Sequence, residues 1–202
     1  ILTDEYIVTS IIDNSKITKE DLVIEVGPGL GTLTKYLIES AGHTISVELD
    51  PKMISVLEDR FSGYDNFTLL HNDILKVNLN TLIDTTLKEK NLKRAKVVAN
   101  LPYYITTPII MKLLEEKLNL DSITVMVQKE VAERLSTKPG KNNTGAITYT
   151  IWYYTTPEII LDVPKDSFIP APKVDSAVLK LNVLKEPRVT LSNEELFFKI
   201  IK

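Results

Sequence analysis

Short runs of β-branched and aliphatic residues alternate with helical patterns along most of this 202-residue sequence. Runs such as Val97-Val98-Ala99 are apolar at every position, as expected for a strand covered on both faces. Strands that alternate with helices favour a mostly parallel sheet with crossover helices, and hence an α/β fold. The expected parallel strands are Leu22–Gly27, Thr44–Leu49, Phe67–Asn72, Lys96–Asn100 and Ile123–Gln128.

The sequence after Gly145 and the helical segments between the strands are expected to complete one sheet with helices on both faces. After Gly145, a helix-like segment leads to Pro157. Glu158–Val163 and Ser176–Leu184 are then expected to form an antiparallel ending, separated by the rigid proline-rich loop Ile169-Pro170-Ala171-Pro172. The other helices are expected to begin near Leu30, Pro51, Leu79, Thr107 and Lys129.

Composition excludes several kinds of protein. The chain has no cysteine and two histidines, His43 and His71, so disulfides, thiolate sites and a histidine-built metal site are not expected. No stretch approaches the roughly 20 apolar residues of a membrane span, and nothing resembles a signal peptide. We therefore predict a cytoplasmic protein without a metal. A net charge of −3 also argues against a nonspecific binder of polyanions.

The two ends suggest a piece of a longer protein. The chain starts at Ile1 and ends at Lys202, inside a segment whose pattern predicts a helix. We expect one domain over residues 1–186, with residues 187–202 beginning a second, helical one.

A glycine-rich loop, Gly27-Pro28-Gly29-Leu30-Gly31, follows the first expected strand. Glycine lets the backbone approach a ligand closely, and open α/β sheets bind ligands outside the carboxyl ends of their strands. The dinucleotide fingerprint wants glycine at its first, third and sixth positions, but the sixth is Thr32 here. The spacing instead matches S-adenosylmethionine-binding methyltransferases. A purely structural tight turn is the alternative.

Carboxylates follow the next two expected strands. Glu48 can accept hydrogen bonds from vicinal ribose hydroxyls, or it can be a charge at the helix start that Pro51 marks. Asp73 can accept a hydrogen bond from an adenine amine, or it can cap a turn. A glycine loop, a Glu and an Asp at three consecutive strand ends are explained jointly by a bound adenosine moiety.

The tetrapeptide Asn100-Leu101-Pro102-Tyr103 follows the fourth expected strand, at the same edge of the sheet. It can be a strand-ending turn, because Asn and Pro both favour turns. Alternatively, the Asn100 side chain and a backbone carbonyl at Leu101 or Pro102 can bind both N–H groups of an adenine N6 amine. Tyr103 then offers a ring face on which a flipped-out base can stack.

Taken together, these segments resemble the ribosomal RNA adenine dimethyltransferase family, and within it most of all the bacterial small-subunit branch. The resemblance runs from Leu2 to the end of the chain. It implies a Rossmann-like class I methyltransferase with a mostly parallel seven-stranded sheet. The segments that carry it are Ile24–Gly31, Val47–Asp50, Asn72-Asp73, Asn100–Ile105, Gln128–Ala132 and Phe168–Ser176.

The resemblance also implies roles for single residues. The cofactor would be S-adenosyl-L-methionine, with Glu48 at its ribose, Asp73 at its adenine and Asn100 at the reaction centre. Phe168 would stack on the target adenine opposite Tyr103, although a core role is equally open without the family. The expected cofactor contacts are Leu2, Gly27, Gly29, Gly31, Glu48, Asp73 and Asn100; the expected catalytic group is Asn100, Leu101, Pro102, Tyr103 and Phe168.

The implied activity is N6,N6-dimethylation of two adjacent adenosines in the 3′-terminal hairpin loop of small-subunit rRNA. The implied partner is that RNA in an immature small ribosomal subunit, bound by a monomer. Two alternatives remain: an antibiotic-resistance methyltransferase acting on large-subunit rRNA, and a non-catalytic ribosome-assembly or transcription factor on the same fold. Intact glycines and Asn100 disfavour the second.

Basic residues near the predicted site suit the phosphates of an unpaired RNA loop. Lys165 and Lys173 flank Phe168 in the sequence. Four others surround the helix expected after the fifth strand: Lys129, Arg134, Lys138 and Lys141.

Overall fold

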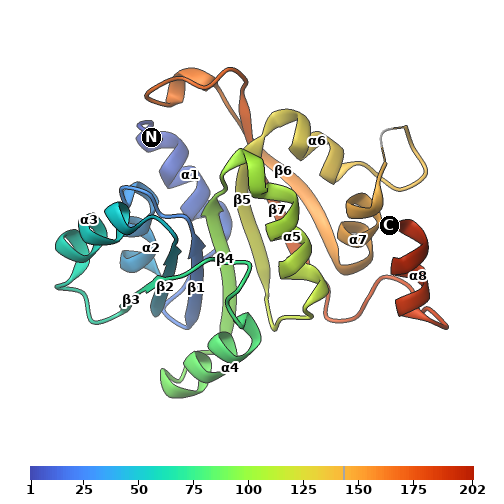
Figure 1. Cartoon of the computed structure of the whole chain (residues 1–202), viewed down its shortest axis with the longest axis horizontal. Coiled ribbons are helices and arrows are strands. Elements are labelled where there is room, and N and C mark those ends of the chain that lie inside the picture. Colours follow the sequence, from blue (N-terminus) through green and yellow to red (C-terminus); the bar gives the residue numbers. More distant parts are fainter. Residues whose placement is uncertain (143) are drawn as a thin grey trace.

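The computed structural model describes residues 1–142 and 144–202, which fold around one seven-stranded sheet (Figure 1). The strand order is β3-β2-β1-β4-β5-β7-β6; the first five strands of the chain run parallel, and β7 runs antiparallel to both of its neighbours. The predicted fold class is therefore confirmed. The strands are β1 (Asp21–Val26), β2 (His43–Glu48), β3 (Phe67–His71), β4 (Arg94–Asn100), β5 (Ser122–Gln128), β6 (Thr155–Val163) and β7 (Ser176–Val183).

The helices include one that the sequence pattern had not singled out. In α1, Asp4 caps the first turn by accepting hydrogen bonds from the backbone N–H groups of Tyr6 and Ile7. The others begin within about two residues of their expected positions. They are α1 (Glu5–Ser15), α2 (Thr32–Ser40), α3 (Pro51–Phe61), α4 (Leu79–Glu89), α5 (Thr106–Glu115), α6 (Lys129–Ser136), α7 (Ala146–Tyr154) and α8 (Glu194–Ile201).

Two groups of helices cover the two faces of the sheet. Because successive side chains of a strand point to opposite faces, Leu22 and Ile24 of β1 join one core and Val23 joins the other. The first core includes apolar residues of α4, α5, α6 and α7. The second includes residues of α1 and α2, and α3 packs beside α2 in a smaller cluster.

The edge strand β6 starts earlier than expected. We predicted a strand over Glu158–Val163, but it begins at Thr155 and includes Pro157. Proline lacks an N–H group, and it is tolerated here because β6 has a partner on one side only.

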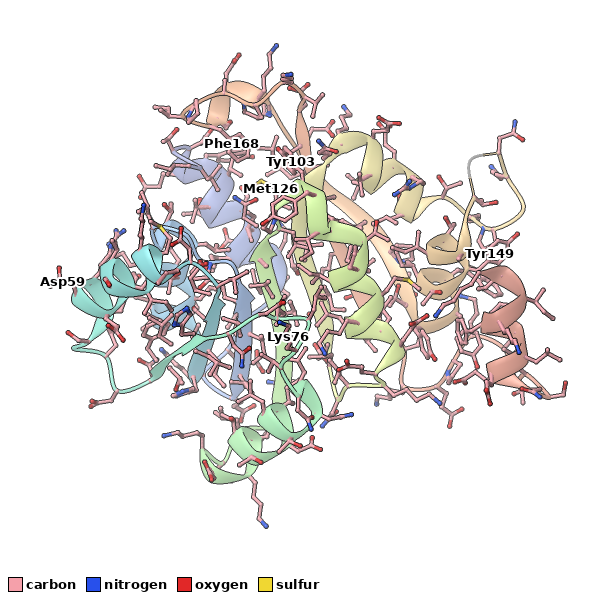
Figure 2. All side chains as sticks on the ribbon, in the orientation of Figure 1. Asp59, Lys76, Tyr103, Met126, Tyr149 and Phe168 are labelled. Atoms are coloured by element: carbon pink, nitrogen blue, oxygen red, sulfur yellow. The ribbon has the colours of Figure 1, made fainter. Side chains whose placement is uncertain are left out.

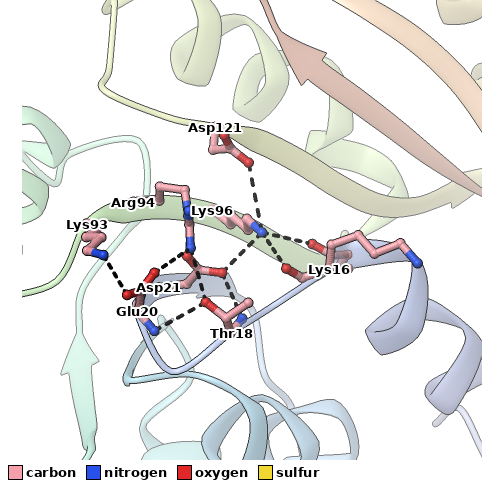
Figure 3. Close-up of polar contacts among 9 residues, drawn as sticks. Lys16, Thr18, Glu20, Asp21, Lys93, Arg94, Lys96 and Asp121 are labelled. Carbon is pink, nitrogen blue, oxygen red and sulfur yellow. Dashed lines mark hydrogen bonds and ion pairs between the residues drawn. The ribbon is translucent and has the colours of Figure 1, made fainter.

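An ion-pair network joins the strand starts at the edge opposite the glycine loop (Figure 3). The ammonium group of Lys96 on β4 lies 3.1 Å from the Asp21 carboxylate of β1, and both side chains are almost fully buried. Arg94 donates a second hydrogen bond of 2.8 Å to Asp21. Burial raises the pKa of Asp21, but hydrogen bonds from Arg94, the Thr18 backbone and Lys96 together hold it below its usual value.

Two lysines also cap the last turn of α1. Lys96 donates to the carbonyl groups of Ser15 and Lys16, at 3.3 and 2.7 Å, and Lys180 on β7 donates to that of Asn14 at 2.7 Å. Cations at a helix C-terminus satisfy free carbonyl groups and complement the helix dipole. These bonds fix α1 against the sheet.

The segment after β7 packs back on α7. Arg188 donates to the carbonyl groups of Trp152 and Thr155, and Tyr153 donates to Glu194 at the start of α8. The domain boundary between residues 186 and 187 stays a prediction. In the part of the chain that the structure describes, every helix is too short or too polar to cross a membrane.

We expect Lys96→Met to lower the free energy of unfolding by about 3 kcal/mol, because it leaves the buried Asp21 carboxylate and the end of α1 without their cation. Denaturant unfolding measures this change. Lys93→Met is the matched control, since the Lys93–Glu20 pair is largely exposed and its loss should go undetected. Equal effects of the two substitutions would contradict the assigned role of Lys96.

Candidate active site

A cavity of about 430 Å³ opens at the carboxyl ends of β1 and β4. In the sheet, β2 and β3 lie beyond β1, and β5 lies beyond β4. The strand order therefore reverses between β1 and β4, which is where the cavity opens. The cavity is lined by Ile1, Leu2, Glu25, Gly27, Pro28, Gly29, Leu30, Thr32, Leu33, Met53 and Asn100.

A second cavity of about 350 Å³ adjoins the first. Ile1 and Asn100 line both, so they stand at the junction. Figure 2 shows Tyr103 and Phe168, which line the second cavity, at the same end of the molecule. Its lining residues are Ile1, Asn100, Leu101, Pro102, Tyr103, Phe168, Pro170 and Pro172.

Two glycines of the loop line the first cavity, and the third packs between two helices. Gly27 and Gly29 line the first cavity with φ of +64° and +57°. A Cβ atom built on Gly29 would meet nothing within 4 Å, which leaves room for a ligand beside the backbone. Gly31 does not line the cavity: its Cβ would lie 2.5 Å from the ring of Phe61. Gly31 therefore lets α2 approach α3.

Glu48 lies directly beside the glycine loop. Its carboxylate accepts hydrogen bonds of 2.8 Å from the backbone N–H groups of Leu49 and Asp50, and one of 3.3 Å from Gly29. These bonds hold the carboxylate against Gly29, which lines the first cavity, although Glu48 itself is not among the lining residues.

Asp73 lies in the loop after β3, away from the lining of both cavities. Its carboxylate accepts a hydrogen bond from the backbone N–H of Leu75 at 3.0 Å. The turn-capping role weighed for this residue is thus present in the structure, and a contact with adenine stays a prediction.

The Leu101 and Pro102 carbonyls of the Asn100–Tyr103 turn differ in their partners. The Pro102 carbonyl already accepts hydrogen bonds from the Ile105 N–H and the Thr106 hydroxyl, at 3.2 and 3.1 Å. Within residues 1–142 and 144–202, no group donates to the Leu101 carbonyl or to the Asn100 side chain. Of the two carbonyls left open by the sequence, that of Leu101 is the one available.

The two aromatic rings are both anchored. The Tyr103 hydroxyl shares a 2.7 Å hydrogen bond with the hydroxyl of Ser176, which is fully buried. Phe168 is 9% exposed and belongs to the core cluster that contains Leu2 and Met126. Phe168 also pairs with Leu2 as an isolated antiparallel bridge. It therefore lines the second cavity and packs in the core at once.

Sequence reasoning did not single out Glu25, which lines the first cavity and is 1% exposed. Burial, assisted by the charge of Glu48, raises the pKa of its carboxyl group to about 7, against the opposing hydrogen bonds from Ser46 and Thr34. The available signal was a carboxylate within an otherwise apolar strand, where charged residues are rare. Among the described residues, no group of three or more His, Cys, Asp or Glu side chains could hold a metal ion.

The strand order, the glycine loop at the β1 end and the paired cavities define a methyltransferase of the class that uses S-adenosylmethionine. Solved structures support this class. A 23S rRNA methyltransferase, ErmE, superposes with a TM-score of 0.82 at 25% identity, over the whole of this chain and 77% of its own. A dimethyladenosine transferase from Plasmodium falciparum gives 0.78 at 31% identity, over 92% of this chain and 64% of its own.

Sequence comparisons define the family. The ribosomal RNA adenine dimethylase model matches residues 1–202. A protein of Clostridium botulinum named ribosomal RNA small subunit methyltransferase A is 48% identical over all of this chain and 71% of its own length. One of the same name from Lachnoclostridium phytofermentans is 49% identical, over 69% of its length. The chain belongs to the ribosomal RNA adenine dimethylase family, and it is an S-adenosylmethionine-dependent rRNA methyltransferase.

We expect Tyr103→Phe to destabilise the protein by about 1–3 kcal/mol, since it leaves the buried Ser176 hydroxyl without its partner. Thermal melts measure the loss. Adding Ser176→Ala should restore part of it, because removing both polar partners costs less than orphaning one. Tyr104→Phe is the matched control, because Tyr104 is 87% exposed. A silent Tyr103→Phe would show that the hydroxyl contact is dispensable.

Proposed function

We propose that this chain dimethylates the N6 amines of two adjacent adenosines in the 3′-terminal hairpin loop of small-subunit rRNA. The observation that carries the proposal is the junction of the two cavities, where the Asn100 side chain and the Leu101 carbonyl accept no hydrogen bond from any described residue. The choice of the small subunit rests on the printed name of the relatives that are 48–49% identical.

The first cavity fits the cofactor. The open space beside Gly29 accommodates a ligand close to the backbone, and the Glu48 carboxylate held against Gly29 can accept ribose hydroxyls. Leu2 and Gly27 line the same cavity. The Asp73 carboxylate, in the loop after β3, would accept a hydrogen bond from the adenine amine of the cofactor. When bound there, S-adenosylmethionine supplies an electrophilic methyl group.

The Asn100–Leu101 pair activates the nucleophile. An adenine N6 amine is a poor nucleophile because its lone pair is delocalised into the ring. The Asn100 side-chain oxygen and the Leu101 carbonyl accept its two N–H groups and so favour a pyramidal nitrogen, with the lone pair directed away from both acceptors. The methylated amine is cationic and gives up its proton readily, so the site requires no strong base.

The second cavity holds the target base. Tyr103 and Phe168 line it together with Pro170 and Pro172, which add flat apolar surface without N–H donors. Bases extruded from an RNA loop stack on aromatic rings, a contact worth about 1–3 kcal/mol per base. The Tyr103–Ser176 hydrogen bond keeps the Tyr103 ring oriented before RNA arrives.

We expect Asn100→Ala to lower turnover by about 100-fold, because it removes one of the two acceptors that orient the amine. Transfer of a tritiated methyl group to immature small subunits measures this, with large-subunit RNA as the competing substrate. Asn80→Ala, an exposed substitution on the remote helix α4, is the control (Figure 1). Wild-type turnover in Asn100→Ala would reduce Asn100 to a turn residue, and preferential methylation of large-subunit RNA would favour the antibiotic-resistance alternative.

We expect Glu48→Ala to weaken binding of S-adenosylhomocysteine by about 1.5–3 kcal/mol, the range for hydrogen bonds to a charged group. Isothermal titration calorimetry on the folded variant measures it. Glu58→Ala on α3 is the control, since Glu58 is exposed on the helix that follows. Unchanged affinity in Glu48→Ala would remove the ribose assignment.

We further propose that the protein works as a monomer in the cytoplasm, where immature small subunits are found. Lys129 of α6 and Lys165 and Lys173 of the segment after β6 line one surface pocket. Lys173 directly follows Pro172, which lines the second cavity, so these cations suit the phosphates of a looped RNA.

A further inference from the structure

Tyr104 has the most exposed of the large apolar and aromatic side chains among the described residues, at 87%. It directly follows Tyr103, which lines the second cavity. Within residues 1–142 and 144–202, no group forms a hydrogen bond with the Tyr104 hydroxyl. An exposed ring contributes little to packing, and the mechanism proposed above gives this one no task.

The backbone that carries Tyr104 is fixed on both sides. Tyr103, Tyr104 and Ile105 form one short 3₁₀ turn, in which successive side chains point about 120° apart. The Tyr103 hydroxyl is bonded to Ser176, and Ile105 packs against the core on the α5 side of the sheet. The Ile105 N–H also donates to the Pro102 carbonyl at 3.2 Å. Tyr104 is therefore presented to the solvent on a backbone that its neighbours hold in place.

The surface around the second cavity combines apolar and cationic side chains. Ile169 and Val174 are both exposed and belong to the segment after β6, whose prolines line the cavity. Val174 also lines the surface pocket that contains Lys165 and Lys173. Proteins that bind single-stranded nucleic acid combine aromatic rings for the bases with cations for the backbone. Such a surface fits unpaired RNA better than it fits an apolar protein partner.

A substrate with two adjacent adenosines brings a second base to this surface. When one adenosine is extruded into the second cavity, the next nucleotide lies at the cavity mouth, because a single phosphodiester links the two. Its base has lost the stacking partner that entered the cavity, and this loss opposes extrusion unless the protein replaces the contact. An exposed ring beside the mouth replaces it for any base, since every base has a π face.

We propose that Tyr104 stacks on the base next to the adenosine held in the second cavity, so that Tyr103 and Tyr104 receive two consecutive bases. This inference rests on the proposed function and adds to it the contact that holds the second nucleotide. While one adenosine is methylated, its neighbour is kept unpaired on Tyr104. The contact uses the ring face and does not need the hydroxyl group.

The first test removes the ring. We expect Tyr104→Ala to raise the KM for immature small subunits about 5- to 150-fold, the range of one base–aromatic stack, and to leave the KM for S-adenosylmethionine unchanged. Tyr104→Phe keeps the ring and should behave as wild type. Tyr104→Leu keeps an apolar side chain without a ring and should behave like Tyr104→Ala.

Two controls separate stacking from a structural role. Thermal melts should show all three Tyr104 variants to be as stable as wild type, because the side chain is exposed. Tyr64→Ala removes another exposed ring, after α3 and away from the lining of the second cavity, and should leave both KM values unchanged.

The second test removes the base instead of the ring. Hairpin RNAs carry one target adenosine with an abasic nucleotide on its 5′ or its 3′ side, and fluorescence anisotropy measures their binding with S-adenosylhomocysteine present. For the wild-type protein, the abasic nucleotide on one of the two sides should weaken binding by the same factor as Tyr104→Ala. For Tyr104→Ala, that RNA should bind no worse than the intact hairpin, because both changes remove the same contact.

The two proposals fail in different ways. A wild-type KM for small subunits in Tyr104→Ala or in Tyr104→Leu would overturn the role of Tyr104 and leave the proposed function standing. An effect of Tyr104→Ala that is the same on the intact hairpin and on both abasic hairpins would do so too. A wild-type protein that transfers no methyl group to small subunits would overturn the proposed function, and the role of Tyr104 with it. The kinetic comparison decides the matter even if the hairpins bind too weakly to measure.

Discussion

The parallel pairing of β1 with both β2 and β4 is the constraint on which the rest of the structure depends. Because the chain leaves β1 toward β2 and returns on its other side as β4, the loops after β1 and β4 diverge and open a crevice between them. The glycine loop lies on one side of that crevice and the Asn100–Tyr103 turn on the other. Both cavities exist because these two strands are neighbours.

Contacts far apart in the sequence then close the crevice. Ile1 and Thr3 form backbone hydrogen bonds with Ile169 and Ser167, so the start of the chain and the proline-rich loop share one wall. The same segment leads into α1, whose far end is held by Lys96 and Lys180. Through α1, the ion-pair network at the opposite edge helps to hold Ile1 and Leu2, which line the first cavity.

Charge is distributed unevenly between the two edges of the sheet. At the strand starts, the buried Asp21 carboxylate has Lys96 and Arg94 as partners and serves stability. At the strand ends, the Glu25 carboxyl group is buried, receives hydrogen bonds from two hydroxyl groups and lies near the negative Glu48; no described cation pairs with it. A buried carboxyl group without a cation costs stability, and natural proteins keep such costs mainly at functional sites.

The sequence by itself determined the sheet, most of the helices and the positions of the functional segments, because strand and helix periodicity, glycine spacing and the Asn100–Tyr103 turn are local patterns. It missed α1, which begins after the Asp4 cap, and the early start of β6, which includes a proline within an edge strand. Only the tertiary structure decided which carbonyl is free and that Gly31 serves packing against Phe61. It also decided that Glu25 faces the cavity. Each of these depends on neighbours supplied by another part of the chain, and no pattern along the sequence records them.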